Sequence, residues 1–192
     1  MGTAACGSIT GRSERDPDQD FQNFVALAER AQEEGFTAYW LGRSFDAGGL
    51  TFEGPSVADF GADVTGGGID MSYDARIVGE GTVPLNLTLY TEEAWEHAEN
   101  EICESGHCQT QSRDPARRQN VRLLGRDALL LLIAGGTRPV NSARLIIDMG
   151  DTMVLAAAGS GGPAVPGGPD LNPLIDPGEL LRVMEQLRPY PR

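Results

Sequence analysis

The chain has 192 residues, which is enough for one domain with a sizeable core or for two very small ones. Hydrophobic residues make up 40% of the sequence, a share that excludes a wholly disordered chain. The formal net charge of -13 repels phosphate backbones and anionic lipid headgroups. We therefore expect no nucleic-acid partner and no attraction to a membrane through surface charge.

The basic side chains are all arginines, because the sequence contains no lysine. A P-loop places a lysine on the phosphates, a protein kinase uses a strand lysine, and pyridoxal phosphate enzymes hold their cofactor through a lysine. These three classes are therefore excluded, and the sequence predicts no cofactor. The longest apolar run, 128–134, has the length of a core segment and is too short to span a membrane.

The first sixteen residues are polar and rich in glycine, serine, arginine and aspartate. They predict a flexible tether at 1–16, followed by a single globular domain at 17–192. Asp16 has the side chain of a helix cap, a proline follows it, and Gln19 stands three residues further on, as in a capping box. We expect a helix from this point to Gly35. Its apolar face consists of Phe21, Phe24, Val25, Ala28 and Ala31.

Strands are expected next, with one long interruption. The aromatic stretch 36–42 predicts a strand, whereas 43–68, rich in glycine and acids, predicts a loop with short strand pieces near 50–52. Residues 68–78 and 84–90 alternate between apolar and polar side chains, as half-buried strands do. Thr91 then caps a short helix.

The second half of the chain begins with a polar segment, 109–119, that predicts an exposed loop. Four further strands are expected, at 120–125, 128–134, 143–149 and 152–158. Gly150 and Asp151 give a hairpin signal between the last two strands, and 159–173 predicts a loop because it is rich in glycine and proline. Asp176 opens a final helix that Pro189 ends.

This order of elements predicts the fold class. Helices stand at both ends of the domain, and the strands between them do not alternate regularly with crossover helices. A doubly wound parallel sheet is therefore disfavoured. We expect an α+β domain with a mostly antiparallel sheet packed against the N- and C-terminal helices.

Two cysteines and both histidines of the chain fall within twelve residues. Cys103 and Cys108 enclose four residues, and a disulfide between them would close a tight turn and contribute about 2 kcal/mol. Such a bond fits an exported protein, and we favour it. The alternative is a zinc site formed by His97, Cys103, His107 and Cys108, which supply the right number of nitrogen and sulfur ligands.

Catalysis has few candidate residues in this sequence. A Ser-His-Asp or Cys-His site would have to use His97 or His107, and no Gly-x-Ser-x-Gly motif accompanies them. Carboxylates are plentiful, and Asp63, Asp70 and Asp74 surround a glycine-rich stretch that could hold calcium. Their spacing does not match an EF-hand loop, however. The sequence therefore favours binding over catalysis.

An aromatic group around Arg43 is the candidate binding surface. It consists of Tyr39, Trp40, Phe45 and Phe52. Such side chains line ligand pockets and dominate partner surfaces. The alternative is that they fill the core of the sheet, which is the commoner use of aromatic residues in strands.

The segment AACGS, from Ala4 to Ser8, resembles the end of a bacterial lipoprotein signal. In that family an apolar segment before the cysteine is removed, and the cysteine takes up diacylglycerol. Here Thr3 stands where an aliphatic residue is usual, and the apolar segment is missing. The order of elements is also similar to small exported lipoproteins of GC-rich bacteria. The resemblance implies a lipid on Cys6 and an exported protein, anchored to a membrane at the cell surface or in the periplasm.

These observations lead to three hypotheses. The first is a surface-tethered domain that binds a protein or small-molecule partner without catalysis. The second is a hydrolase or zinc-dependent enzyme that uses the window from His97 to Cys108. The third is a structural subunit of an envelope complex, for which an exposed apolar patch around 39–52 would be evidence.

Overall fold

A computed structural model of the chain describes residues 16–57, 68–77, 81–96, 118–135, 138–159 and 176–191. The helices are α1 (Pro17–Glu33) and α4 (Pro177–Met184), and a helical turn spans 92–96. The strands are β1 (Tyr39–Trp40), β2 (Ser44–Ala47), β3 (Leu50–Val57), β4 (Gly68–Ile77), β5 (Gly81–Tyr90), β6 (Arg118–Leu123), β7 (Arg126–Gly135), β8 (Arg138–Asp148), β9 (Met153–Gly159) and β10 (Arg188–Pro189).

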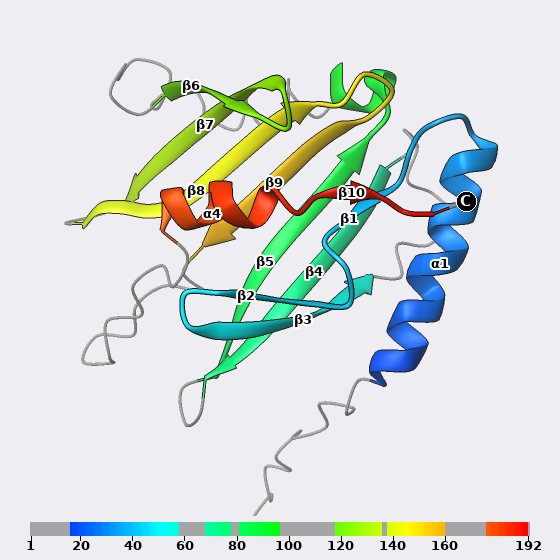
Figure 1. The fold of residues 1–192 in the computed structure, drawn as a ribbon, viewed down its shortest axis with the longest axis horizontal. Helices are drawn as coiled ribbons and strands as arrows, with labels where there is room; N and C mark the ends of the chain where they lie inside the picture. Colours follow the sequence, from blue (N-terminus) through cyan, green and yellow to red (C-terminus); the bar gives the residue numbers. More distant parts are fainter. Residues whose placement is uncertain are drawn as a thin grey trace, which may run out of the picture.

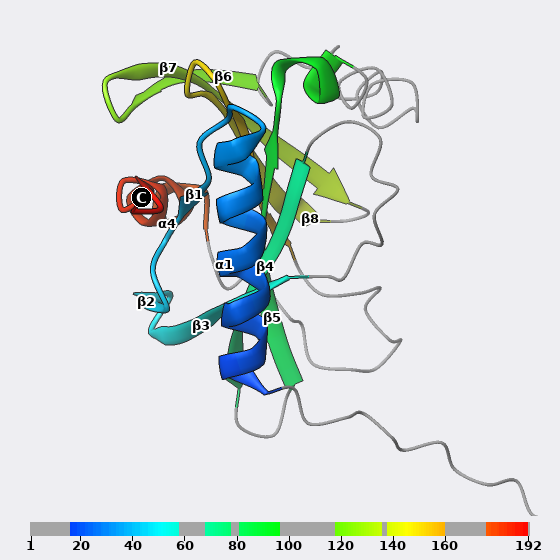
Figure 2. The ribbon, with the colours of Figure 1, turned by 90° about the vertical axis from the view of Figure 1, so that its right-hand side faces the viewer.

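Eight strands form one antiparallel sheet in the order β2-β3-β4-β5-β9-β8-β7-β6 (Figure 1). The remaining two, β1 and β10, pair with each other as a short ribbon. Helix α1, helix α4 and this ribbon lie on the same side of the sheet (Figure 2). The predicted α+β class, with an antiparallel sheet and terminal helices, is therefore confirmed.

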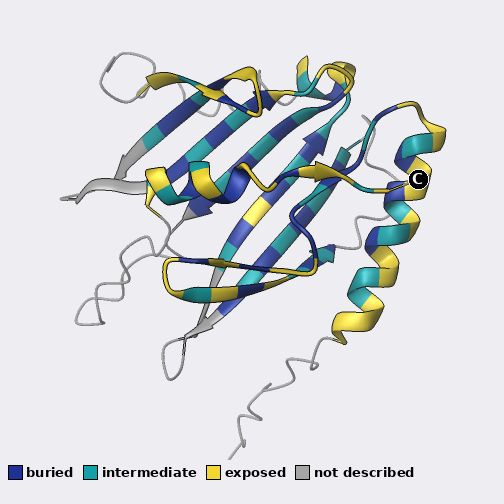
Figure 3. Cartoon of the chain, viewed as in Figure 1, coloured by how far each residue is buried: buried dark blue, intermediate teal, exposed yellow. Residues whose placement is uncertain are grey.

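The core lies between this sheet face and the elements that cover it. Buried and less buried residues alternate along the strands (Figure 3). On β5, Leu85, Leu87 and Leu89 are fully buried, as their alternation predicts. Each faces a small or branched side chain on β9, where Ala158, Ala156 and Val154 are their partners. Because large side chains on β5 lie beside smaller ones on β9, the two central strands pack closely in the core.

Both terminal helices begin as their sequences indicate. The carboxylate of Asp16 accepts a hydrogen bond of 3.0 Å from the backbone N–H of Asp18, and Asp176 accepts one of 2.8 Å from Glu179. Each cap is followed by a proline. Pro189, which was expected to end the second helix, instead lies in strand β10, because α4 already ends at Met184.

Two predictions for the first third of the chain were only partly right. The strand expected at 36–42 is reduced to Tyr39 and Trp40, which pair with β10 and not with the main sheet. The strand pieces expected near 50–52 belong to the longer strand β3, and the surrounding loop expected at 43–68 also contains β2, because Gly48 and Gly49 form a two-residue turn between the two strands. Both have positive φ angles of 59° and 74°, which glycine adopts without steric cost.

Candidate functional site

Phe45 and Phe52 of the predicted aromatic group lie in the core. They sit opposite each other on β2 and β3, and their rings stack with centroids 5.1 Å apart. Phe45 is 6% exposed and Phe52 is not exposed at all. The ring of Tyr73 on β4 packs edge-on against Phe45 at 5.3 Å. These two phenylalanines therefore attach the β2–β3 hairpin to the protein and are not available to a partner.

Tyr39 also lies largely inside the molecule. Burial, and then the charge of Asp151, raise the pKa of its hydroxyl above the usual value, while Arg126 acts in the opposite direction. The backbone just before it is held by Thr37, whose hydroxyl donates to the carboxylate of Asp151. Thr152 completes this contact by donating to the Thr37 carbonyl at 2.9 Å. Tyr39 is thus part of the connection between α1 and the β8–β9 turn.

Trp40 is the aromatic residue of the group that reaches the surface. Its indole is half-buried among three rings from distant parts of the chain. Phe24 stacks on it at 5.7 Å, Phe21 lies at 5.9 Å, and Tyr190 meets it edge-on at 5.2 Å. Of these partners Phe24 is fully buried, whereas Phe21 and Tyr190 are partly exposed. The rings form a rigid aromatic cluster with one open side.

Two exposed arginines lie over this cluster. The guanidinium carbon of Arg43 is 3.9 Å from the centre of the Phe21 ring, and that of Arg188 is 5.6 Å from the Trp40 ring. Arg43 also pairs with the exposed carboxylate of Asp18 at 3.4 Å. Such contacts hold a guanidinium in place while leaving its donors accessible. We call this group, Phe21, Trp40, Arg43, Arg188 and Tyr190, the Trp40 surface.

Sequence reasoning identified only Trp40 and Arg43 of this surface. Phe21 was assigned to the inner face of α1, and Arg188 and Tyr190 were not singled out. These residues come together because β1 pairs with β10, with Trp40 opposite Arg188. A strand pair of two residues has no periodicity, so the sequence contains no signal for it.

A buried hydroxyl holds the Trp40 surface on the sheet. The backbone N–H of Leu41, next to Trp40, donates to the Tyr73 hydroxyl at 3.0 Å. Tyr73 is fully buried on β4, and this burial is the main reason why its pKa is raised far above the usual value. The segment that includes Trp40 is thereby fixed to β4. The surface is preorganised, which lowers the entropy lost on binding.

One polar atom of the surface has no partner. The indole N–H of Trp40 is buried and finds no acceptor among the described residues. A buried donor without an acceptor costs about 1–3 kcal/mol, which structures seldom retain without a reason.

Of the other predicted site residues, some lie in the described part of the chain and some do not. Asp70 and Asp74 lie on β4, and both are half-buried. In the described part of the chain, no three histidine, cysteine, aspartate or glutamate side chains are placed to hold a metal ion. Cys6, Asp63, His97, Cys103, His107 and Cys108 lie outside the described residues.

Among the helices in the described ranges, none combines the length and the apolar character that crossing a membrane requires. Comparisons with protein-family models, with curated proteins and with solved structures found no match to this chain.

Proposed function

We propose that the chain is a non-catalytic binding domain and that the Trp40 surface contacts its partner. The observation that supports this is the combination of a preorganised aromatic cluster with two exposed arginines above it. Tryptophan, tyrosine and arginine are the residues that most often dominate the energy of protein interfaces. Few other arrangements place all three on one small patch.

The charge of the protein indicates the kind of partner. The chain has a formal net charge of -13, so its surface repels acidic molecules in general. Arg188 and Arg43, the latter already beside Asp18, are local exceptions, and a guanidinium group can form two hydrogen bonds with a carboxylate in a fixed geometry. A protein segment with a carboxylate beside an apolar or planar group fits this surface best.

Attachment to a membrane is the second part of this proposal. The sequence AACGS supports a lipid on Cys6, and a polar segment would then separate the lipid from α1. A domain held in this way would meet its partner at the cell surface or in the periplasm. Mass spectrometry of the protein from its native membrane tests this point, because an unmodified Cys6 would contradict it.

Site-specific cross-linking tests the Trp40 surface itself. A photoreactive phenylalanine derivative at position 191, an exposed site next to Tyr190, should capture one discrete partner in the full chain expressed in its own cells. The same derivative at position 30, an exposed site on α1, serves as the control. Arg188→Glu should abolish capture from position 191, whereas Arg182→Glu, at an exposed site on α4, should leave it unchanged. Equal capture from both positions would contradict the proposal.

The enzyme hypothesis has a separate test. Metal analysis and thiol titration of the full-length protein distinguish a zinc site from a disulfide in the window from His97 to Cys108. About one equivalent of zinc, together with protected but reduced cysteines, would favour the enzyme. A metal-free protein with a Cys103–Cys108 disulfide would leave the binding domain as the better hypothesis.

A further inference from the structure

The hairpin β6–β7 has a turn that its sequence does not favour. Leu123 pairs with Arg126, so the turn consists of Leu124 and Gly125, with φ angles of 52° and 75°. A turn of this kind favours glycine, asparagine or aspartate, because a positive φ brings the Cβ atom close to the backbone. Leu124 is also 39% exposed, and it is the exposed large hydrophobic residue of the described chain.

The hairpin at the other edge of the sheet shows that this strain is avoidable. There the turn between β2 and β3 has similar φ angles, 59° and 74°, but both of its residues are glycines. An exposed leucine in a strained conformation contributes little to folding, whereas such outliers cluster at functional sites. This contrast points to a role of Leu124 outside the core.

Strand β6 forms the edge of the sheet next to this turn. It pairs with β7 on one side, and no other described strand pairs with its outer side. Four of its six residues are exposed. An edge strand offers unpaired N–H and C=O groups, which are the groups that a partner strand recognises.

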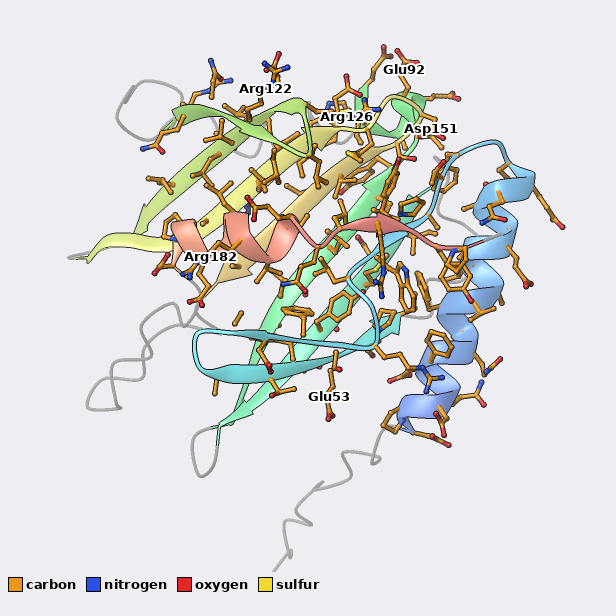
Figure 4. All side chains as sticks on the ribbon, viewed as in Figure 1. Glu53, Glu92, Arg122, Arg126, Asp151 and Arg182 are labelled. Carbon is orange, nitrogen blue, oxygen red and sulfur yellow. The ribbon has the colours of Figure 1, made fainter. Side chains whose placement is uncertain are left out.

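The edge is positively charged on an acidic protein. Arg118, Asn120 and Arg122 share one face of β6, because strand side chains alternate. Arg122 donates to the carbonyl of Gly125 at 3.5 Å, and Asp127 lies opposite it on β7. Among the described residues no carboxylate forms an ion pair with either arginine. Figure 4 shows Arg122 projecting away from the sheet at this end. Five of the fifteen arginines of the chain fall between residues 113 and 126.

We propose that β6 binds an acidic, extended segment of a partner protein as an added antiparallel strand. Two carboxylates four residues apart on that segment would face Arg118 and Arg122, and Leu124 would supply an apolar contact at the end of the strand. Charged residues also serve to keep edge strands unpaired. The exposed Leu124 at the end of the same edge would favour association and not prevent it. The arginines are therefore better explained as selecting the partner.

A second copy of the chain fits this edge poorly. In a symmetric β6–β6 pairing centred on Asn120, Arg118 of one copy would lie opposite Arg122 of the other. Like charges directly opposite each other destabilise a strand pair. The partner is therefore a different, acidic segment. This inference concerns a surface distinct from the Trp40 surface and does not depend on it.

Titration with short peptides tests the proposal on the full-length protein. The probe is the capped peptide Thr-Glu-Val-Thr-Val-Glu-Thr, and the control peptide has glutamine in place of both glutamates. Amide hydrogen exchange, measured residue by residue, reports where each binds. We expect the acidic peptide to protect β6 amides and to bind at least tenfold more tightly than the control. A form of the acidic peptide N-methylated on the amides that face β6 should lose this protection.

Charge reversal provides the matched variants. Arg118→Glu with Arg122→Glu should weaken binding of the acidic peptide at least tenfold and create binding of a peptide with lysines in place of both glutamates. Arg30→Glu with Arg182→Glu changes the net charge equally, at exposed sites on the helices, and should have no effect. Equal binding of the acidic and glutamine peptides, protection at β2 instead of β6, or concentration-dependent protection of β6 without peptide would each overturn the proposal.

Discussion

The hairpins β2–β3 and β6–β7 close opposite edges of one sheet with the same two-residue turn, but they differ in what they bury. The first contributes the stacked pair Phe45 and Phe52 to the core. Strand β6 buries only Leu123 and leaves arginines on the surface. Its turn retains a strained, exposed Leu124 where the other has glycine. An edge that the core does not need is free to carry side chains selected for binding.

Truncating one side chain in each hairpin should show the difference in stability most strongly. Phe52→Ala deletes a fully buried ring, so we expect a loss of about 3–5 kcal/mol in the free energy of unfolding. Val121→Ala, at a half-buried position on β6, should cost about 1 kcal/mol or less. Urea unfolding of both variants measures the two losses. Similar losses would show that β6 is as much a part of the core as β3.

A smaller effect is expected from Tyr73, which packs on Phe45 at the β2 edge and has no counterpart under β6 among the described residues. Tyr73→Phe keeps the ring that packs on Phe45 but removes the acceptor of the Leu41 N–H. A buried donor without its acceptor should cost about 1–3 kcal/mol. The same variant should weaken partner binding at the Trp40 surface and leave the acidic peptide at β6 unaffected. Weaker binding at both the Trp40 surface and β6 would mean that the two surfaces are coupled.

Alkaline pH should destabilise the folded protein through two tyrosines, Tyr39 and Tyr73. The pKa values of Tyr39 and Tyr73 are raised in the folded protein, each mainly by burial. Above pH 10 the unfolded chain releases these protons while the folded chain keeps them. Stability should therefore fall as pH rises, by up to about 1.4 kcal/mol per pH unit for each tyrosine. Denaturant unfolding at pH 9 and 11 measures the loss, and Tyr73→Phe should reduce it.

The turns themselves give the smallest effect and the most direct comparison. Leu124→Gly should relieve strain and stabilise the protein by about 1 kcal/mol, while Gly48→Leu should destabilise it by about 1–2 kcal/mol. Thermal unfolding of the two variants measures both changes. The stabilised Leu124→Gly protein should bind the acidic peptide less tightly, which would separate a role in binding from a role in folding. Destabilisation by Leu124→Gly would show that the leucine is needed for the fold.

Much of the fold could be predicted from local patterns. The capped starts of both helices, the alternation of Leu85, Leu87 and Leu89, and the hairpin at Gly150 each depend on residues close together in sequence. The hairpin β2–β3 could have been found as well, because Gly48 and Gly49 stand between two short alternating stretches. The density of glycine and acids across 43–68 concealed that signal.

The candidate site was only partly predictable. The aromatic group around Arg43 was found from its composition, but its members have separate places in the structure. Phe45 and Phe52 face the core, while Trp40 joins Phe21 and Tyr190 at the surface. Aromatic content alone does not distinguish these positions, because burial depends on which element covers each face of a strand.

The sequence by itself determined the α+β class, the starts of the two terminal helices and the exclusion of lysine-dependent chemistry, because these follow from residue types and short-range periodicity. Only the tertiary structure decided that β1 pairs with β10, that β6 lies at an edge, and that Leu124 is strained and exposed. Strand order and burial arise from contacts between residues far apart in the chain. Such contacts are selected by packing the whole core, and no local pattern encodes them.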